Sequence, residues 1–317
     1  MLVWIFSFIF VIGFVLCASS AIPETAEALK TFLFIVLPSV FPLCVLSDWL
    51  VRTGAFRLTG RLFAPLMKPL FGVSGTGALS IMTGLIGSYP TAAKTTAQLY
   101  KNGEITYEEA LKLSAFTNNA GPLFIIGVLG TNMLRSTTLG VILWCIHVTA
   151  SLLTGILMGK FYRNRHTSLN RKPIPLVEVK KQNPFLLLSS SIASAMETMI
   201  PVCGTVLFFA SLCAMIEAIQ MKELQSVGNL LSMFLEMTTG CQTVDKLSLT
   251  SLSEASALLT RCCLFSGVVS WGGCSVHMQT IYIFSQNGLP CSRYLIGKIF
   301  HTIIAVGLTG LVMWLYI

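Results

Sequence analysis

Long apolar runs separated by short polar segments make up most of this chain, and they predict helices that cross a membrane. Such a helix needs about 20 predominantly apolar residues. We predict seven spans, over 1–21, 31–50, 105–129, 138–158, 196–219, 253–284 and 295–316. The first has no Lys or Arg before it, so we expect it to remain as a helix rather than be cleaved as a signal peptide. Pro38 and Pro42 predict a kink in the second.

Two shorter segments each combine an apolar stretch with a polar stretch, and neither stretch is long enough to cross a bilayer. We predict that each forms a re-entrant hairpin. The first covers 75–101, with its tip at Gly87-Ser88-Tyr89-Pro90, and the second covers 232–247. An amphipathic helix is predicted before each hairpin, over 52–68 and 220–231.

Two of the predicted spans are interrupted by polar, glycine-containing sequence. The interruptions are Asn118-Asn119-Ala120-Gly121-Pro122 and Ser270-Trp271-Gly272-Gly273. Lipid offers no hydrogen-bond partner to interrupted backbone, so such backbone must be buried in protein or line a water-filled cavity. The two breaks and the two hairpin tips therefore mark the expected solute path.

The same order of elements occurs twice: kinked helix, amphipathic helix, hairpin, broken helix and plain helix. The loop between the two copies carries seven Lys or Arg residues and one acid, Glu178, which predicts a cytoplasmic loop. The second copy then enters from the opposite side, as in inverted-repeat transporters. We predict an all-α polytopic membrane protein with about seven spanning helices, two re-entrant hairpins and an inverted-topology repeat. The expected units are the N-terminal helix 1–22, the repeats 31–159 and 185–317, and the basic loop 160–184.

Composition agrees with this class of protein. The chain has 317 residues, of which 54% are hydrophobic and 11% charged, whereas a soluble domain carries about 25% charge. The net charge of +8 could indicate nucleic-acid binding, but much of the excess lies in the basic loop, so we expect no nucleic acid. The ten cysteines contain no CxxC pair, and no hydrolase or P-loop motif occurs. We expect no catalytic site, metal or cofactor.

The first hairpin carries four candidate solute-binding residues, Ser88, Tyr89, Thr91 and Lys94. Hydroxyls and free amide groups at a helix start attract anions, and Lys94 would face an anionic solute. In the alternative interpretation, the hydroxyls cap the helix and Lys94 extends to the surface or pairs with an acid.

The breaks and the second hairpin supply the other candidates. Asn118 and Asn119 offer amide donors and acceptors, although they could instead cap the freed backbone. Glu236 could bind a coupling proton or cation, or pair with Lys94. Ser270 marks the second break.

Four segments carry a resemblance to a known family. They are Leu37-Pro-Ser-Val-Phe-Pro42, Gly84-Leu-Ile-Gly-Ser-Tyr-Pro90 with Lys94, Thr117-Asn-Asn-Ala-Gly-Pro122 and Glu236-Met-Thr-Thr-Gly240. In these segments the chain resembles the YlbJ family of sporulation integral membrane proteins, within the wider group of nucleoside-recognition (Gate) domain proteins, which are similar to concentrative nucleoside transporters. The resemblance implies transport of dipicolinic acid from the mother cell across the outer forespore membrane.

Three functions remain open at this stage. The first is transport of a small organic anion, with dipicolinate favoured, and the second is a nucleoside or other nutrient carrier, which would not need Lys94. The third is a non-transporting membrane scaffold for spore-envelope assembly, in which the breaks serve packing alone. The expected partners are the solute, the lipid bilayer and a coupling proton or cation, and a homo-oligomer is also compatible with the sequence.

Overall fold

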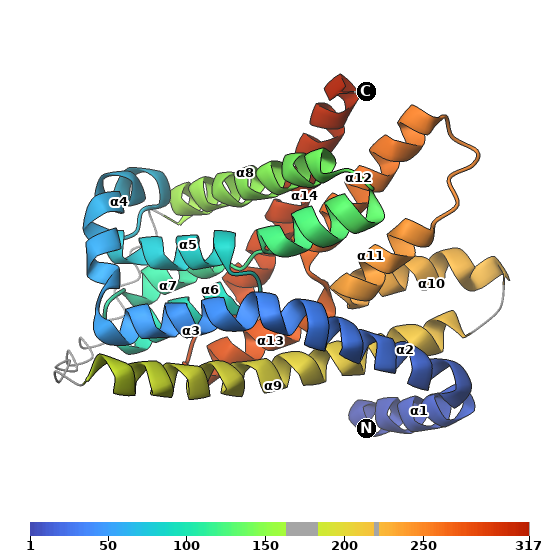
Figure 1. The fold of residues 1–317 in the computed structure, drawn as a ribbon, viewed down its shortest axis with the longest axis horizontal. Helices are drawn as coiled ribbons and strands as arrows, with labels where there is room; N and C mark the ends of the chain where they lie inside the picture. The colour runs from blue at the N-terminus through green and yellow to red at the C-terminus, as the bar shows by residue number, and fades with distance from the viewer. Residues whose placement is uncertain (163–182, 219–221, 317) are drawn as a thin grey trace.

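The structure is a computed structural model that describes residues 1–162, 183–218 and 222–316, and this part of the chain forms helices and no strands (Figure 1). The first half contains α1 (Leu2–Leu16), α2 (Ala18–Thr31), η1 (Phe32–Val36), α3 (Leu37–Thr53), α4 (Phe56–Phe71), η2 (Gly75–Gly77), α5 (Ala78–Ile86), α6 (Thr91–Lys101), α7 (Tyr107–Ser114), η3 (Leu123–Met133) and α8 (Thr137–Phe161). The second half contains α9 (Pro184–Glu217), α10 (Lys222–Leu235), α11 (Met237–Lys246), α12 (Glu254–Trp271), α13 (Gly273–Gln286) and α14 (Ser292–Tyr316).

Within the described residues, five helical segments are long and apolar enough to cross a membrane. They are Ala18–Thr53, Thr137–Phe161, Pro184–Glu217, Glu254–Gln286 and Ser292–Tyr316. A sixth span is possible if Gly60–Phe71 and Gly75–Ile86, which are bent by 96°, count as one. The predicted class, an all-α polytopic membrane protein, is confirmed. Most of the predicted basic loop, 163–182, lies outside the described residues.

The N-terminal region differs from the prediction. The first helix ends at Leu16 and the chain turns at Cys17, so α1 is 15 residues long rather than 21. The polar stretch expected to be a loop is helical instead, and α2, η1 and α3 form one segment of 36 residues. At its centre, η1 is a π-helical turn directly before Pro38, which has no N–H to donate. Ser39 Oγ donates to the carbonyls of Ile35 (2.7 Å) and Val36 (2.9 Å) at this turn.

The first hairpin forms as predicted, with α5 and α6 as its two limbs and the tip at 87–90. The second hairpin differs from the prediction. Its first limb is α10, the segment expected to be a separate amphipathic helix, and its tip is Glu236. The second limb, α11, then runs to Lys246. A hairpin contained within 232–247 was therefore wrong in its start, because helix α10 continues to Leu235.

Both predicted breaks are present. In the first, helix α7 ends at Ser114 and η3 begins at Leu123. In the second, α12 ends at Trp271 and α13 begins at Gly273. Gly272 (φ +88°) and Gly273 (φ +77°) hold the left-handed backbone that separates these two helices, a conformation that glycine adopts without a Cβ clash.

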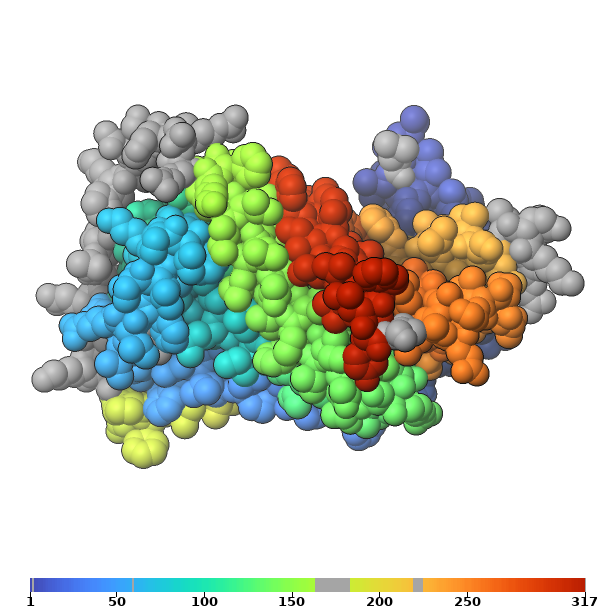
Figure 2. Space-filling view, turned by 90° about the horizontal axis from the view of Figure 1, so that it is seen from above, coloured from blue at the N-terminus to red at the C-terminus, as the bar shows by residue number. Residues whose placement is uncertain are grey.

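Two layers of long helices enclose the hairpins and breaks. The α2–α3 segment lies beside α9 on one side, and α8 lies beside α14 on the other (Figure 1). Figure 2 shows α8 and α14 covering one face of the molecule. Helix α4 crosses the ends of these helices, as expected of the predicted interfacial helix (Figure 1). The polar tips and breaks are therefore held in the interior, between the two layers.

Candidate functional site: a line of cavities along α9

The two breaks and the first hairpin tip are joined by buried hydrogen bonds. Tyr89, at the tip, donates its hydroxyl to the Val269 carbonyl at 2.8 Å. His147 on α8 accepts from the Ala120 N–H at Nε2 (3.2 Å), so its Nδ1 carries the proton and donates to Ser270 Oγ (3.1 Å). Segments far apart in the sequence thus meet at one place, as the interrupted pattern predicted.

A central cavity of about 40 Å³ lies between the two hairpin tips. Its polar lining comes from both tips and from α13, namely Ser88, Tyr89, Glu236, Thr238, Ser275 and Gln279. Its apolar lining includes Val36 of η1 and Val202 and Val206 of α9. One water molecule occupies about 10–15 Å³ by this measure. The cavity therefore admits water, and an organic solute can enter only after the walls separate.

A larger vestibule of about 300 Å³ opens next to the central cavity. Lys94 and Lys101 of α6 line it, together with Glu197 and other polar side chains of α9 and with polar side chains of α13. Val202 and Gln279 line both the vestibule and the central cavity, so these two residues form the boundary between them. In the predicted topology the vestibule faces the cytoplasm, because the basic loop joins the chain at this end of α9.

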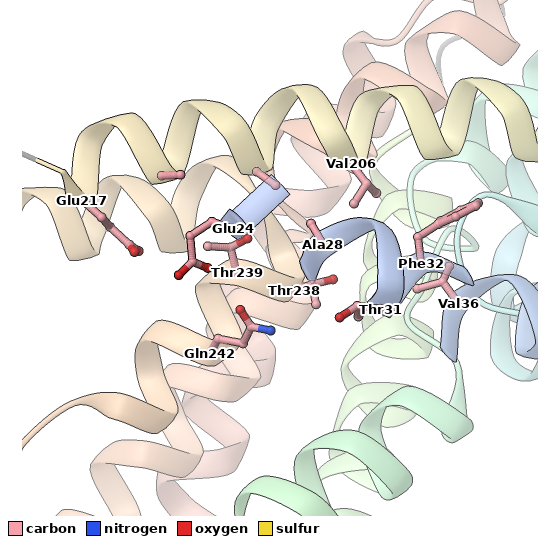
Figure 3. Close-up of a pocket in the computed structure, with 12 residues that line it drawn as sticks. Glu24, Ala28, Thr31, Phe32, Val36, Val206, Glu217, Thr238, Thr239 and Gln242 are labelled. Atoms are coloured by element: carbon pink, nitrogen blue, oxygen red, sulfur yellow. The ribbon is translucent and has the colours of Figure 1, made fainter. Parts of the chain in front are cut away.

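An acidic pocket lies on the other side of the central cavity (Figure 3). It has a volume of about 20 Å³, and Glu24, Glu217 and Gln242 are among its lining residues. Val206 and Thr238, which line the central cavity, also line this pocket. Figure 3 shows their side chains at the place where α2, α9 and α11 approach one another.

Helix α9 sets the order of the three cavities. Ser194 lines the vestibule, Val202 and Val206 line the central cavity, and Glu217 lines the acidic pocket. At a rise of 1.5 Å per residue, Ser194 and Glu217 lie about 35 Å apart along the helix. The hydrocarbon core of a bilayer is about 30 Å thick. The cavities thus extend over the depth of a membrane, from a basic end to an acidic end.

Glu236 is the charged group of the central cavity. It is 2% exposed, accepts a hydrogen bond from the Thr239 N–H at 2.6 Å and caps the first turn of α11. Ser275 Oγ donates to its other oxygen at 3.4 Å. Among the described residues that line this cavity, no Lys or Arg accompanies the carboxylate.

Lys94 does not pair with Glu236, which was one of the interpretations of the sequence. Its Nζ donates to the Ser194 carbonyl at 2.7 Å and lies 3.8 Å from Asp48 Oδ1. Asp48 is fully buried in α3 and also accepts from Arg52 and Gln98. Sequence reasoning missed Asp48, although an acid inside an apolar helix is a recognisable signal.

The eight candidate residues separate into two groups. Ser88, Tyr89 and Glu236 line the central cavity. The remaining five are not among its lining residues. Thr91 contacts Cys44 at 3.3 Å, and Lys94 lines the vestibule. Asn118 donates to Thr280 at 2.7 Å, Asn119 donates to Phe116, Thr117 and Ser151, and Ser270 contacts His147. Asn119 therefore caps the first break, which was its alternative interpretation.

Comparison with known proteins adds the family. Residues 33–143 match the family model Gate, described as nucleoside recognition. The chain is 27% identical over 313 residues to the sporulation integral membrane protein YlbJ of Bacillus subtilis (strain 168), covering 88% of this chain and 75% of the relative. The chain therefore contains a match to the Gate domain and is similar to YlbJ over most of its length. No solved structure matches it.

The Gate domain contains only part of the central cavity. Ser88 and Tyr89 lie within the matched residues, as does Lys94. Glu236 and Gln279 lie beyond them, in the second half of the chain. The Gate domain of this protein therefore requires the second hairpin and α13 to complete the cavity.

Proposed function

We propose that this protein transports a small organic anion, dipicolinate being the favoured solute, and that it moves this solute from the mother cell across the outer forespore membrane during sporulation. The observation that carries the proposal is the line of three cavities along α9, which extends over membrane depth and narrows from the vestibule to the acidic pocket. The sporulation protein YlbJ among its relatives supports the physiological setting.

The chemistry of the path suits this solute in two respects. Dipicolinate is a flat pyridine ring that carries two carboxylates, and Lys94 and Lys101 in the vestibule would attract it. In the central cavity, the Ser88 and Ser275 hydroxyls and the Gln279 amide can donate to carboxylate oxygens. The face of Tyr89 offers a surface against which an aromatic ring can stack.

Glu236 sets a condition on such transport. An ionised carboxylate repels an anion in the same low-dielectric cavity. The solute can bind there only if Glu236 holds a proton or a cation, so we propose that one of these moves together with the solute.

The test is uptake of radiolabelled dipicolinate into proteoliposomes, with and without imposed proton or sodium gradients. We expect the wild-type protein to accumulate the solute when one gradient is imposed. Glu236→Gln should still equilibrate the solute but lose at least about tenfold of its gradient-driven accumulation, because its amide cannot bind the coupling ion. A wild-type protein that moves no dipicolinate under any gradient would contradict the proposed function.

A second candidate function is transport of a nucleoside. The described lining of the central cavity, with a carboxylate, an amide and hydroxyls but no Lys or Arg, favours a neutral polar solute. The family description, nucleoside recognition, points the same way. Uridine uptake in the same proteoliposomes distinguishes the two: uridine transport without dipicolinate transport supports the nucleoside carrier.

The boundary between the central cavity and the acidic pocket predicts a gate at Val206. A tryptophan at this position should reduce solute uptake by roughly tenfold or more, because its ring would fill a narrow part of the path. Ile200→Trp is the matched control, since Ile200 is on the same helix and 67% exposed. Equal uptake by the two variants would show that the path does not pass Val206.

A further inference from the structure

A second buried lysine, Lys298 on α14, lies beside the central cavity. It is 1% exposed, and its Nζ donates to the Tyr89 hydroxyl at 3.0 Å and to the Asn118 carbonyl at 3.2 Å. The same nitrogen lies 4.9 Å from the centroid of the Tyr89 ring. Lys298 therefore contacts the tip of the first hairpin and the first break at once.

Lys298 differs from Lys94 in its charge balance. Lys94 has the carboxylate of Asp48 at 3.8 Å, whereas no carboxylate in the described part of the chain lies within 4.0 Å of the Lys298 nitrogen. A buried ammonium in a membrane protein is costly unless a negative charge or strong acceptors compensate it. Here the described acceptors are one hydroxyl and one carbonyl.

The other ionisable side chains around Lys298 bring no negative charge at neutral pH. They are Tyr89 at the hairpin tip, Tyr294 and His301 on α14, His277 on α13 and His147 on α8. His277 Nδ1 lies 2.9 Å from the Tyr294 hydroxyl, and His301 Nε2 lies 3.1 Å from the His147 carbonyl. None of these neutral or basic groups supplies a negative charge, so a counter-charge for Lys298 has to come from elsewhere.

The central cavity is the place from which that charge can come. Tyr89 lines the cavity, and its hydroxyl accepts a hydrogen bond from Lys298. An anion bound against Tyr89 would therefore feel a charge that is shielded from water and not cancelled by a neighbouring acid.

We propose that Lys298 is the anion-selecting residue of the central cavity, acting through Tyr89, and that a carboxylate of the bound solute supplies its counter-charge. The inference rests on the proposed function and adds the residue that gives the cavity its preference for a carboxylate over a neutral group. Lys94, which shares the carboxylate of Asp48 with Arg52, then serves entry through the vestibule rather than selection.

The test compares two probes that share a ring and differ in charge: dipicolinate and its uncharged diamide, pyridine-2,6-dicarboxamide. Binding of both is measured by calorimetry on detergent-purified wild-type protein, Lys298→Gln and Lys298→Met. Lys298→Gln keeps a donor for Tyr89 and Asn118 without the charge. Lys94→Met tests the competing assignment, in which the vestibule lysine selects the anion.

We expect the wild type to prefer dipicolinate over the diamide, and both Lys298 variants to lose this preference by about tenfold or more through weaker dipicolinate binding alone. A merely structural role would weaken binding of both probes equally. If the Lys298 variants keep the wild-type preference, or if Lys94→Met loses it instead, the assignment of selectivity to Lys298 is overturned. If the wild type binds neither probe, the proposed anion transport itself fails, which is a separate and recognisable result.

Discussion

Replacing Gly84 or Gly297 with alanine should abolish transport and strongly reduce the yield of folded protein. A Cβ on Gly84 of α5 would lie 1.8 Å from the Thr117 carbonyl oxygen, and one on Gly297 of α14 would lie 1.9 Å from the Ala115 carbonyl oxygen. Both distances are far below van der Waals contact, and the obstructing atoms are backbone. The first break is thus held between α5 and α14, and either methyl group would push it away from the central cavity.

The same helices and their neighbours offer matched controls. Gly307→Ala on α14 and Gly127→Ala on η3 place a methyl group where no atom lies within 4 Å. We expect both controls to keep wild-type uptake, while Gly84→Ala and Gly297→Ala lower the unfolding free energy by at least about 1–3 kcal/mol, the usual cost of overpacking. Thermal unfolding in detergent and proteoliposome uptake measure the two effects. Wild-type behaviour of Gly297→Ala would show that the close approach of α14 to the first break is not required.

The local signals that predicted the tips and breaks were strong because glycine, proline and polar side chains are rare within apolar runs. Gly87-Ser88-Tyr89-Pro90 and Gly272-Gly273 both mark positions where the helices end. Each signal depends on backbone chemistry within a few residues. Such features can be identified without knowledge of the tertiary packing.

The errors arose where packing decides the structure. Nothing in the apolar run 1–21 indicates a turn at Cys17, and the polar residues that follow it favour helix as readily as loop. Similarly, the amphipathic pattern of α10 predicts a separate helix that ends before the hairpin. Its place as the first limb of a hairpin depends on its contacts with α11.

The site was predictable in part for the same reason. Ser88, Tyr89 and Glu236 lie at tips, and the sequence indicates tips directly. Asp48 and Lys298 lie in otherwise plain helices, and their partners are distant in sequence: Gln98 for Asp48, and Tyr89 and Asn118 for Lys298. Partners that are distant in sequence can be identified only once the fold is known. A charged residue inside an apolar spanning helix is nonetheless a signal in the sequence that points to both.

Replacing Asp48 with alanine should destabilise the protein more than removing the charge of either lysine that lines the vestibule. The change leaves Lys94, whose side chain is 11% exposed, without its carboxylate, and it removes the acceptor of Arg52 and Gln98. Breaking a buried pair by removing one partner typically costs about 3–5 kcal/mol. Unfolding in mixed detergent–SDS micelles measures this loss.

The double variant Asp48→Ala/Lys94→Met tests the reason for that cost. Removing the stranded ammonium should restore part of the stability, because the penalty comes from the uncompensated charge rather than from the lost contact. Glu27→Ala is the control, since its ion pair with Lys30 is about 60% exposed on both sides and should contribute less than about 1 kcal/mol. If the double variant is no more stable than Asp48→Ala, the buried carboxylate stabilises the protein mainly through its hydrogen bonds with Arg52 and Gln98. The Ser194 carbonyl alone would then be enough to compensate the charge of Lys94.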